Sequence, residues 1–309
     1  MTWKRSLAFA VCAVSLFISA TSRAQENTTL DETIPPGRNF DKADFRLWIP
    51  NGLGQVRAIA VLLTGSNGDA RPQVDEPVWQ AFALKHSLAL VGCRFTDKPH
   101  DQNFIEEYAN ASQGSGQALV DALGLLAKRS QHPEIATVPL LLWGMSAGGQ
   151  FNYEFVAWKP ERVLAFVVNK GGIYYSALLS QAARNVPGIL FVGGKDLEFR
   201  TNTIAGLFAL NRRGGALWAL AEEPAAAHVV GRSRDMTLMF FEDVLPLRLP
   251  DSSEKLRPIA ESSGFIGDLK TKTSQKISGP APNYPTAWLP TARVAHAWEA
   301  MLTEKPFDP

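Results

Sequence analysis

Residues 144–149, GMSAGG, place a single serine among residues that have small side chains or none. This serine, Ser146, directly follows the apolar stretch VPLLLWG, which is typical of a buried strand, and a stretch with helical periodicity follows it. A serine with glycines two residues before and after it, on a tight strand-to-helix turn, is the pattern of a nucleophile elbow. The alternatives are a chance match or a turn in which small residues merely fit. The sequence contains the pattern once, between a strand and a helix, which favours a nucleophile.

A serine hydroxyl becomes a strong nucleophile when a base takes its proton and an acid orients that base. Of the five histidines, His228 and His296 follow Ser146, as the order serine, acid, histidine requires. His228 lies in PAAAHVVG, a loop after a predicted strand, whereas His296 has the helical spacing of a packing or surface residue. The stretch GILFVGG ends shortly before Asp196, which we predict to be the acid. Glu198 is the alternative acid, in case Asp196 only caps the next helix.

Acyl transfer also needs hydrogen-bond donors for the negative charge that develops on the substrate oxygen. One predicted donor is the backbone N–H of Ala147, at the start of a helix whose dipole favours negative charge. The second comes from TGSNG, residues 64–68, after an earlier strand: we expect the N–H of Ser66, with Asn67 as the alternative. This stretch lacks the ending of a P-loop and the spacing of a dinucleotide-binding loop. The sequence therefore indicates no nucleotide, and nothing in it calls for another cofactor.

Three further residues follow predicted strands at the same sheet edge. Tyr174 and Tyr175 are candidates for lining the substrate pocket, although adjacent tyrosines in a loop are also common as partly exposed packing residues. His100, in TDKPHD, has no second ligand at metal-binding spacing, so we predict a loop residue and no metal site. Cys93 lies in the apolar stretch LALVGCRF and is predicted to pack in the core.

The elements that must position these residues alternate between strand and helix. Several predicted strands are apolar throughout, as expected of strands that are covered on both faces. We therefore predict fold class α/β, a mostly parallel sheet with helices on both faces. The pair Asn51-Gly52 predicts a hairpin-like connection between the first two strands. The predicted strands are residues 43–50, 56–63, 88–95, 138–144, 163–170, 188–194 and 216–223, and the predicted helices are residues 75–87, 115–130, 150–158, 203–213 and 234–245.

The N-terminal segment has the features of a secretory signal peptide: Lys4 and Arg5, an apolar stretch, and small residues up to Ala24. We expect cleavage after Ala24, export to the periplasm or beyond, and no membrane span in the mature protein. The net charge of +1 shows no basic surplus, so nucleic acid is not an expected partner. The predicted organisation is a signal peptide at 1–24, an extended leader at 25–42 and one domain at 43–309, in which 249–309 is a C-terminal appendage.

Together these motifs resemble the α/β-hydrolase superfamily, and within it secreted esterases similar to polyhydroxybutyrate depolymerases and feruloyl esterases. The resemblance spans residues 43–245 and rests on GMSAGG, TGSNG, the strand before Asp196, and His228 in its loop. It implies an α/β-hydrolase fold in which Ser146, Asp196 and His228 form a catalytic triad that needs no cofactor. It also implies hydrolysis of a small-molecule or polymeric ester.

The sequence departs from this family at one point, because many relatives have His-Gly where this chain has Thr64-Gly65. A backbone donor survives such a change, but the family pattern no longer predicts how the loop is anchored or which acyl group fits beside it. Two other functions stay open on the sequence: a serine peptidase of the same fold, and a non-catalytic binding protein on a hydrolase scaffold.

Overall fold

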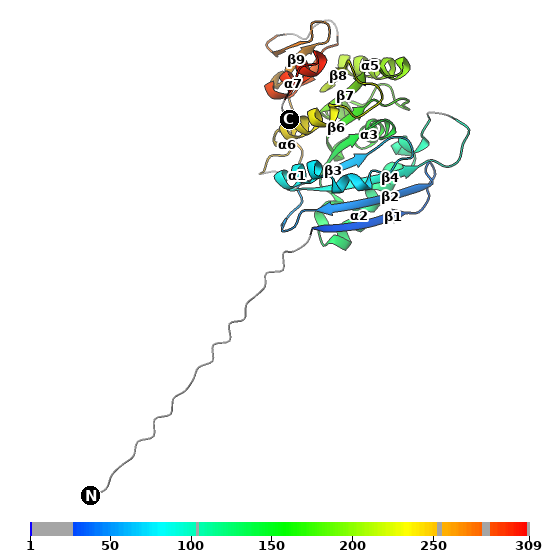
Figure 1. The fold of residues 1–309 in the computed structure, drawn as a ribbon, viewed down its shortest axis with the longest axis vertical. Helices are drawn as coiled ribbons and strands as arrows, with labels where there is room; N and C mark the ends of the chain where they lie inside the picture. The colour runs from blue at the N-terminus through cyan, green and yellow to red at the C-terminus, as the bar shows by residue number, and fades with distance from the viewer. Residues whose placement is uncertain (2–26, 103–104, 252–254, 280–284, 308–309) are drawn as a thin grey trace.

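A central sheet with helices on both faces forms the body of the molecule (Figure 1). The computed structural model describes residue 1 and residues 27–102, 105–251, 255–279 and 285–307, so the predicted signal peptide lies, apart from Met1, outside the described residues. The strands of the sheet are β1 (Thr28–Ile34), β2 (Lys42–Ile49), β3 (Ala58–Leu63), β4 (Leu88–Thr96), β5 (Leu140–Gly144), β6 (Val163–Asn169), β7 (Gly188–Gly193) and β8 (Trp218–Glu223).

The order of the strands within these residues is β1-β2-β4-β3-β5-β6-β7-β8. β2 is antiparallel to both of its neighbours, β1 and β4, whereas neighbouring strands from β4 to β8 are parallel. The predicted mostly parallel α/β sheet is confirmed, and the strand order is that of the α/β-hydrolase fold. Because the parallel strands share one direction, the loops after β3, β5, β6, β7 and β8 meet at one edge of the sheet.

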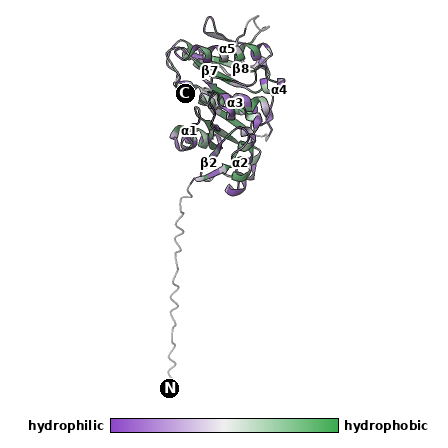
Figure 2. Cartoon of the chain, turned by 90° about the vertical axis from the view of Figure 1, so that its right-hand side faces the viewer, coloured by the Kyte–Doolittle hydropathy of each residue, from purple (hydrophilic) through white to green (hydrophobic). Residues whose placement is uncertain are grey.

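The helices cover the two faces of the sheet in two groups. Helices α2 (Ser115–Ser130), α3 (Ala147–Trp158) and α5 (Glu198–Arg213) pack on one face, and α1 (Pro77–His86), α6 (Ser233–Arg248) and α7 (Ala292–Leu302) pack on the other. Alternate strand residues serve the two cores: in β3, Ile59 and Val61 belong to the first, Ala60 and Leu62 to the second. Figure 2 shows hydrophilic and hydrophobic residues along the same helices, as expected for helices with one buried and one exposed face.

The stretch that the sequence predicts as an extended leader, residues 25–42, contains a strand of the sheet. Residues 28–34 form β1, which pairs antiparallel with β2 in a register that joins Thr28 to Ile49 and Ile34 to Ala43. Its side chains alternate between half-buried and exposed positions, because an edge strand is covered on one face only. The segment TTLDETI has too few apolar residues to stand out as a strand on the sequence alone.

The hairpin predicted at Asn51-Gly52 does not form. The two residues lie in a turn, but β2 then pairs with β1 and β4, while β3 pairs with β4 and β5. The reason is burial: β3 is buried along its whole length and occupies the middle of the sheet, whereas a hairpin with β2 would require β3 beside β2.

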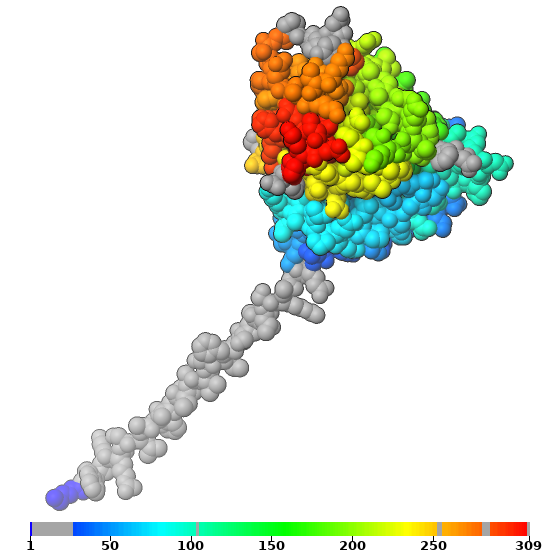
Figure 3. Space-filling view, turned by 45° about the horizontal axis from the view of Figure 1, so that its top comes forward, coloured from blue at the N-terminus to red at the C-terminus, as the bar shows by residue number. Residues whose placement is uncertain are grey.

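The C-terminal part, predicted as an appendage, packs against the main sheet. It contains α7 and a small sheet in the order β10-β9-β11, from strands β9 (Phe265–Asp268), β10 (Thr273–Lys276) and β11 (Ala287–Leu289). Figures 1 and 3 show this part together at one end of the molecule, next to α6. Trp298 of α7 is fully buried, and its indole N–H donates to the carbonyl of Leu220 in β8 at 2.7 Å. No helix among the described residues is long and apolar enough to cross a membrane.

Candidate active site

Ser146 occupies a strained corner between β5 and α3. Its backbone has φ 55° and ψ −121°, a region that residues with a Cβ rarely adopt. A Cβ at Gly144 would lie 2.2 Å from the carbonyl oxygen of Gly148, and one at Gly148 would lie 2.7 Å from the Cβ of Leu63. The N–H of Ser146 donates to the carbonyl of Asn169, the last residue of β6, at 2.8 Å. The two glycines thus allow the close approach that holds the serine at the carboxyl edge of the sheet.

Three of the predicted site residues form one hydrogen-bonded series at this edge. The Nε2 of His228 lies 3.0 Å from the Oγ of Ser146, and its Nδ1 lies 2.8 Å from Oδ2 of Asp196. With Nδ1–H donating to the carboxylate, Nε2 is left to accept the serine hydroxyl. The alternative acid, Glu198, accepts instead from the Asn202 amide, and the alternative base, His296, is exposed on α7.

The carboxylate of Asp196 has three hydrogen-bond donors. Its Oδ2 faces His228, while its Oδ1 accepts the N–H of Leu197 at 2.7 Å and Nη1 of Arg200 at 3.0 Å. Burial alone would raise the pKa of this carboxyl group, but the hydrogen bonds from His228, Leu197 and Arg200 outweigh it and lower the pKa below its usual value. Asp196 is therefore held ionised beside the imidazole. Arg200 lies on α5, whereas Asp196 precedes this helix, so their ion pair depends on the path of the chain before α5 and was missed at the sequence level.

The predicted oxyanion donors belong to two segments that meet near Ser146, the start of α3 and the loop after β3. Among the described residues, the N–H groups of Ala147 and Ser66 have no hydrogen-bond acceptor. The chain next to Ser66 approaches Ser146 closely, because a Cβ at Gly65 would lie 3.8 Å from the serine Cβ. The alternative donor, the N–H of Asn67, donates to the hydroxyl of Tyr108 at 3.1 Å. The geometry thus favours Ser66 over Asn67 as the second donor.

Thr64, which follows β3, anchors this loop through its backbone and its methyl group. Its carbonyl oxygen accepts the N–H of Gly148 at 3.0 Å. A Cβ at Gly68 would lie only 2.7 Å from Cγ2 of Thr64, so the loop folds tightly over this side chain. The loop is thereby joined to the first turn of α3, directly beneath Ser146.

A cavity of about 380 Å³ opens beside the loop that holds Ser66. His100 borders it, with Nε2 at 3.6 Å from Oδ2 of Asp97. Within the described ranges, no three His, Cys, Asp or Glu side chains come together in a way that could hold a metal ion. The residues that line the cavity are Ser66, Asn67, Asp97, Lys98, Pro99, His100, Gln102, Ile105 and Glu106. Most of these side chains are polar, so a substrate group placed here would meet hydrogen-bonding partners.

Two residues that the sequence analysis missed connect this cavity to the nucleophile. Glu106 is buried, and its carboxylate accepts from the amide of Gln150 at 3.1 Å. The amide oxygen of Gln150 in turn accepts the N–H of Gly172 at 2.9 Å, and the N–H of Gln150 donates to the carbonyl of Ser146. No motif in the sequence points to either residue, since the contact joins segments that are far apart in the chain.

The two tyrosines proposed to line the substrate pocket differ in their surroundings. Tyr174 packs edge-on against Tyr153 with ring centroids 5.1 Å apart, and burial raises the pKa of its hydroxyl. Tyr175 is 42% exposed, and its hydroxyl donates to the backbone carbonyl of Glu106 at 3.0 Å. Tyr174 is thus a packing residue in this structure, whereas Tyr175 ties its loop to the chain beside the cavity. A contact of either residue with substrate stays a prediction.

A buried ion pair lies beneath the loop that carries His228. Nζ of Lys170, just after β6, lies 2.9 Å from Oε2 of Glu223 at the end of β8, and the two side chains are 0% and 9% exposed. The other carboxylate oxygen, Oε1, accepts the N–H of Arg232 at 2.6 Å. Lys170 also donates to Oδ1 of Asn169 at 3.2 Å. The pair therefore joins two strand ends to the segment that follows His228.

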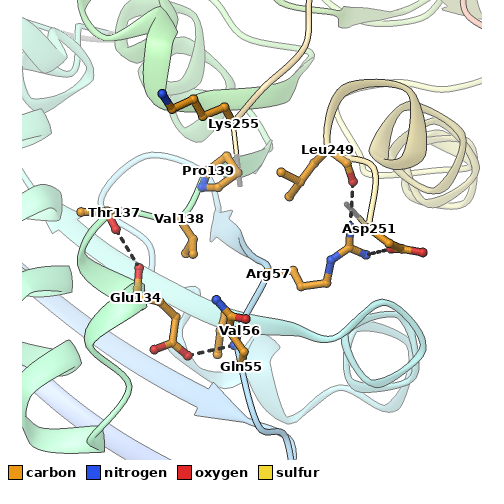
Figure 4. A pocket seen from close by; sticks show the side chains of 10 residues that line it. All are labelled: Gln55, Val56, Arg57, Glu134, Thr137, Val138, Pro139, Leu249, Asp251 and Lys255. Carbon is orange, nitrogen blue, oxygen red and sulfur yellow. Dashed lines mark hydrogen bonds and ion pairs between the residues drawn. The ribbon is translucent and has the colours of Figure 1, made fainter. Parts of the chain in front are cut away.

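A larger hollow, of about 700 Å³, lies at the opposite edge of the sheet, by the start of β3 and of β5 (Figure 4). Its charged groups have partners in the wall: Arg57 lies 2.8 Å from Asp251, and the carboxylate of Glu134 accepts the N–H of Val56 at 2.9 Å. None of the predicted site residues lines it. The candidate active site is therefore the carboxyl edge that holds Ser146.

Comparisons with known proteins find solved structures of low similarity to this chain. No family model and no curated protein matches the chain. The poly(3-hydroxybutyrate) depolymerase LpqC from Bordetella parapertussis is 17% identical over 74% of this chain and 92% of its own, with a TM-score of 0.47. An esterase from Pyrobaculum calidifontis is 13% identical over 71% of this chain and 85% of its own, with a TM-score of 0.49. The chain's own strand order and serine corner define its α/β-hydrolase fold.

Proposed function

We propose that this protein is an exported serine hydrolase that cleaves carboxylic esters. The observation that carries the proposal is the hydrogen-bonded series from Ser146 through His228 to Asp196, with the serine on a strained elbow. The N–H groups of Ala147 and Ser66 beside the serine add the donors that acyl transfer requires. The substrate class, a small-molecule or polymeric ester, follows from the resemblance of these motifs to secreted esterases.

In the proposed reaction, Oγ of Ser146 attacks the ester carbonyl carbon while Nε2 of His228 takes the hydroxyl proton. The N–H groups of Ala147 and Ser66 stabilise the oxyanion, and Asp196 stabilises the imidazolium. The tetrahedral intermediate collapses, the alcohol leaves with the proton from His228, and an acyl-serine remains. A water molecule then attacks the acyl-serine with His228 as base, which releases the acid and restores Ser146.

The proposed site of action is outside the cytoplasm, with the chain cleaved after Ala24. This part rests on residues 1–24 alone, which have the charge, the apolar stretch and the small residues of a signal peptide. Mass spectrometry of the protein exported by a bacterial host tests it. A mature N-terminus at Gln25 is expected, and an uncleaved chain would contradict the proposal.

Hydrolysis of p-nitrophenyl esters of increasing acyl length tests the proposed reaction. We expect turnover by the native protein and a loss of about three powers of ten or more in kcat for Ser146→Ala. His228→Ala should lose activity comparably, whereas the matched control His296→Ala, at an exposed histidine, should retain it. The absence of turnover in both the native protein and Ser146→Ala would favour a binding protein, and cleavage of peptide anilides with inert esters would favour a peptidase.

A further inference from the structure

Arg200 contacts the acid of the triad from the side that faces away from the histidine. Its Nη1 lies 3.0 Å from Oδ1 of Asp196, while the other carboxylate oxygen lies 2.8 Å from Nδ1 of His228. Both charged side chains are shielded from solvent, with 11% of Arg200 and 2% of Asp196 exposed. One carboxylate thus serves two cationic partners, the guanidinium permanently and the imidazole whenever it is protonated.

The guanidinium is held in place by its surroundings. Its Cζ lies 5.1 Å from the centre of the Phe199 ring, and its Nε would be 3.6 Å from a Cβ at Gly172. Gly172 in turn donates its N–H to Gln150 at the foot of the nucleophile helix. Arg200 therefore fills the space between the acid loop and the segment after β6, and it cannot swing away from Asp196 without leaving this packing.

Other charged side chains also lie on the segments packed around His228. Lys170 and Glu223 form a pair with each other, so their charges largely cancel at the imidazole. Lys195 and Glu198 are exposed and therefore screened by solvent. These charged residues are Lys170, Lys195, Glu198, Glu222, Glu223 and Arg232. Within the described part of the chain, the carboxylate of Asp196 has direct contact with two basic side chains, the imidazole of His228 and the guanidinium of Arg200.

We propose that Arg200 is a positioning residue of the active site: it fixes the carboxylate of Asp196, which orients His228, and it offsets part of the negative charge that faces the imidazole. The proposal rests on the proposed function for its catalytic meaning. The physical reason is that a partner cation competes with the imidazolium for the same carboxylate and repels it as a like charge. Without the guanidinium, Asp196 would stabilise the protonated imidazole more strongly, and the base would be lost at a higher pH.

The pH profile of kcat/KM with a p-nitrophenyl ester tests this inference. For Arg200→Met we expect the acidic limb to move up by about 0.5–1 pH unit, because removal of the cation favours the imidazolium. Arg200→Lys keeps a positive charge but not the planar guanidinium, so its limb should move less than that of Arg200→Met. The matched control is Arg213→Met, which removes an exposed arginine from the far end of the same helix and should not move the limb.

Direct titration of the imidazole separates this inference from the proposed function. In the full protein labelled with 13C at histidine Cε1, the signal of His228 is assigned by its absence in His228→Gln. Its titration midpoint should rise in Arg200→Met, rise less in Arg200→Lys and stay in place in Arg213→Met, whether or not the native protein cleaves esters. A midpoint and an acidic limb that do not move in Arg200→Met, or a uniform loss of activity at every pH, would overturn the role of Arg200. If Arg200→Met does not fold, Arg200→Gln provides the same comparison.

Discussion

Ser146 holds a strained backbone conformation at the corner between β5 and α3. Ser146 has φ 55° and ψ −121°, and such a conformation costs a residue with a Cβ about 1–3 kcal/mol. Glycine carries no such cost, although it loses about 0.5–1 kcal/mol more chain entropy on folding. We therefore expect Ser146→Gly to be more stable than Ser146→Ala by about 1 kcal/mol, while both are inactive.

Urea unfolding at equilibrium measures this difference. The two variants lack the same hydroxyl group and the same hydrogen bond to His228, so their comparison isolates the backbone. Equal midpoints, or a lower midpoint for the glycine variant, would show that the surrounding glycines and α3 hold no strain at Ser146.

At the scale of single residues, the sequence predicts the site residues that directly follow strands, but not the neighbouring residues that hold them in place. The positions of Ser146, Asp196 and His228 after apolar stretches place them at one sheet edge, where the structure brings them within hydrogen-bond distance. Glu106 and Gln150 carry no such signal, because their contact depends on how distant segments pack. Local spacing therefore indicates which groups face the edge but not which neighbours hold them.

At the scale of elements, the buried pair of Lys170 and Glu223 fixes the loop that carries His228 to the sheet. Removal of one partner leaves an uncompensated buried charge, which typically costs about 3–5 kcal/mol. We therefore expect Lys170→Met alone to be strongly destabilising, and the double variant Lys170→Met/Glu223→Gln to recover a large part of the loss. The glutamine keeps an acceptor for the N–H of Arg232.

A double-mutant cycle in urea measures this coupling. As a control, the more exposed pair of Lys159 and Glu161, 3.9 Å apart, should give a coupling below about 1 kcal/mol. Additive effects at Lys170 and Glu223 would mean that the two charges act independently and that the loop is held by other contacts.

The sequence predicts a strand correctly where both faces of the strand are buried, but not where only one face is buried. Strands such as β3 and β6 are buried at every position, and their apolar stretches are recognisable without any partner. β1 is half-exposed along its length, and its polar segment has a strand conformation because β2 pairs with it. The hairpin prediction was wrong for a related reason. The pair Asn51-Gly52 predicts only a local turn, whereas β3 lies in the middle of the sheet because both of its faces must be buried.

At the scale of the whole molecule, the C-terminal part is joined to the body by a core and by a cluster of charges. Glu242 on α6 accepts from Lys85 at the end of α1 and from Arg293 on α7, and it lies 3.2 Å from Nε2 of His86. The cluster therefore connects three helices of one face, including the helix that closes the C-terminal part. The sequence indicates helical spacing around His296, but the ionic contacts of this helix depend on tertiary structure.

This cluster makes a pH-dependent contribution to stability. Burial by itself would raise the pKa of Glu242, but the hydrogen bonds from Lys85 and Arg293 lower it from 4.5 to about 2. Because the pKa is lower in the folded state, the contribution is complete above about pH 4.5 and is lost as the pH falls towards 2. We expect Glu242→Gln to lower the free energy of unfolding by about 1 kcal/mol at pH 7, since the groups are partly solvated. The difference in unfolding free energy between Glu242→Gln and the native protein should be smaller at pH 3 than at pH 7. The exposed control Glu161→Gln should show a small difference at both pH values. If the effect of Glu242→Gln does not depend on pH, the role of Glu242 is one of packing.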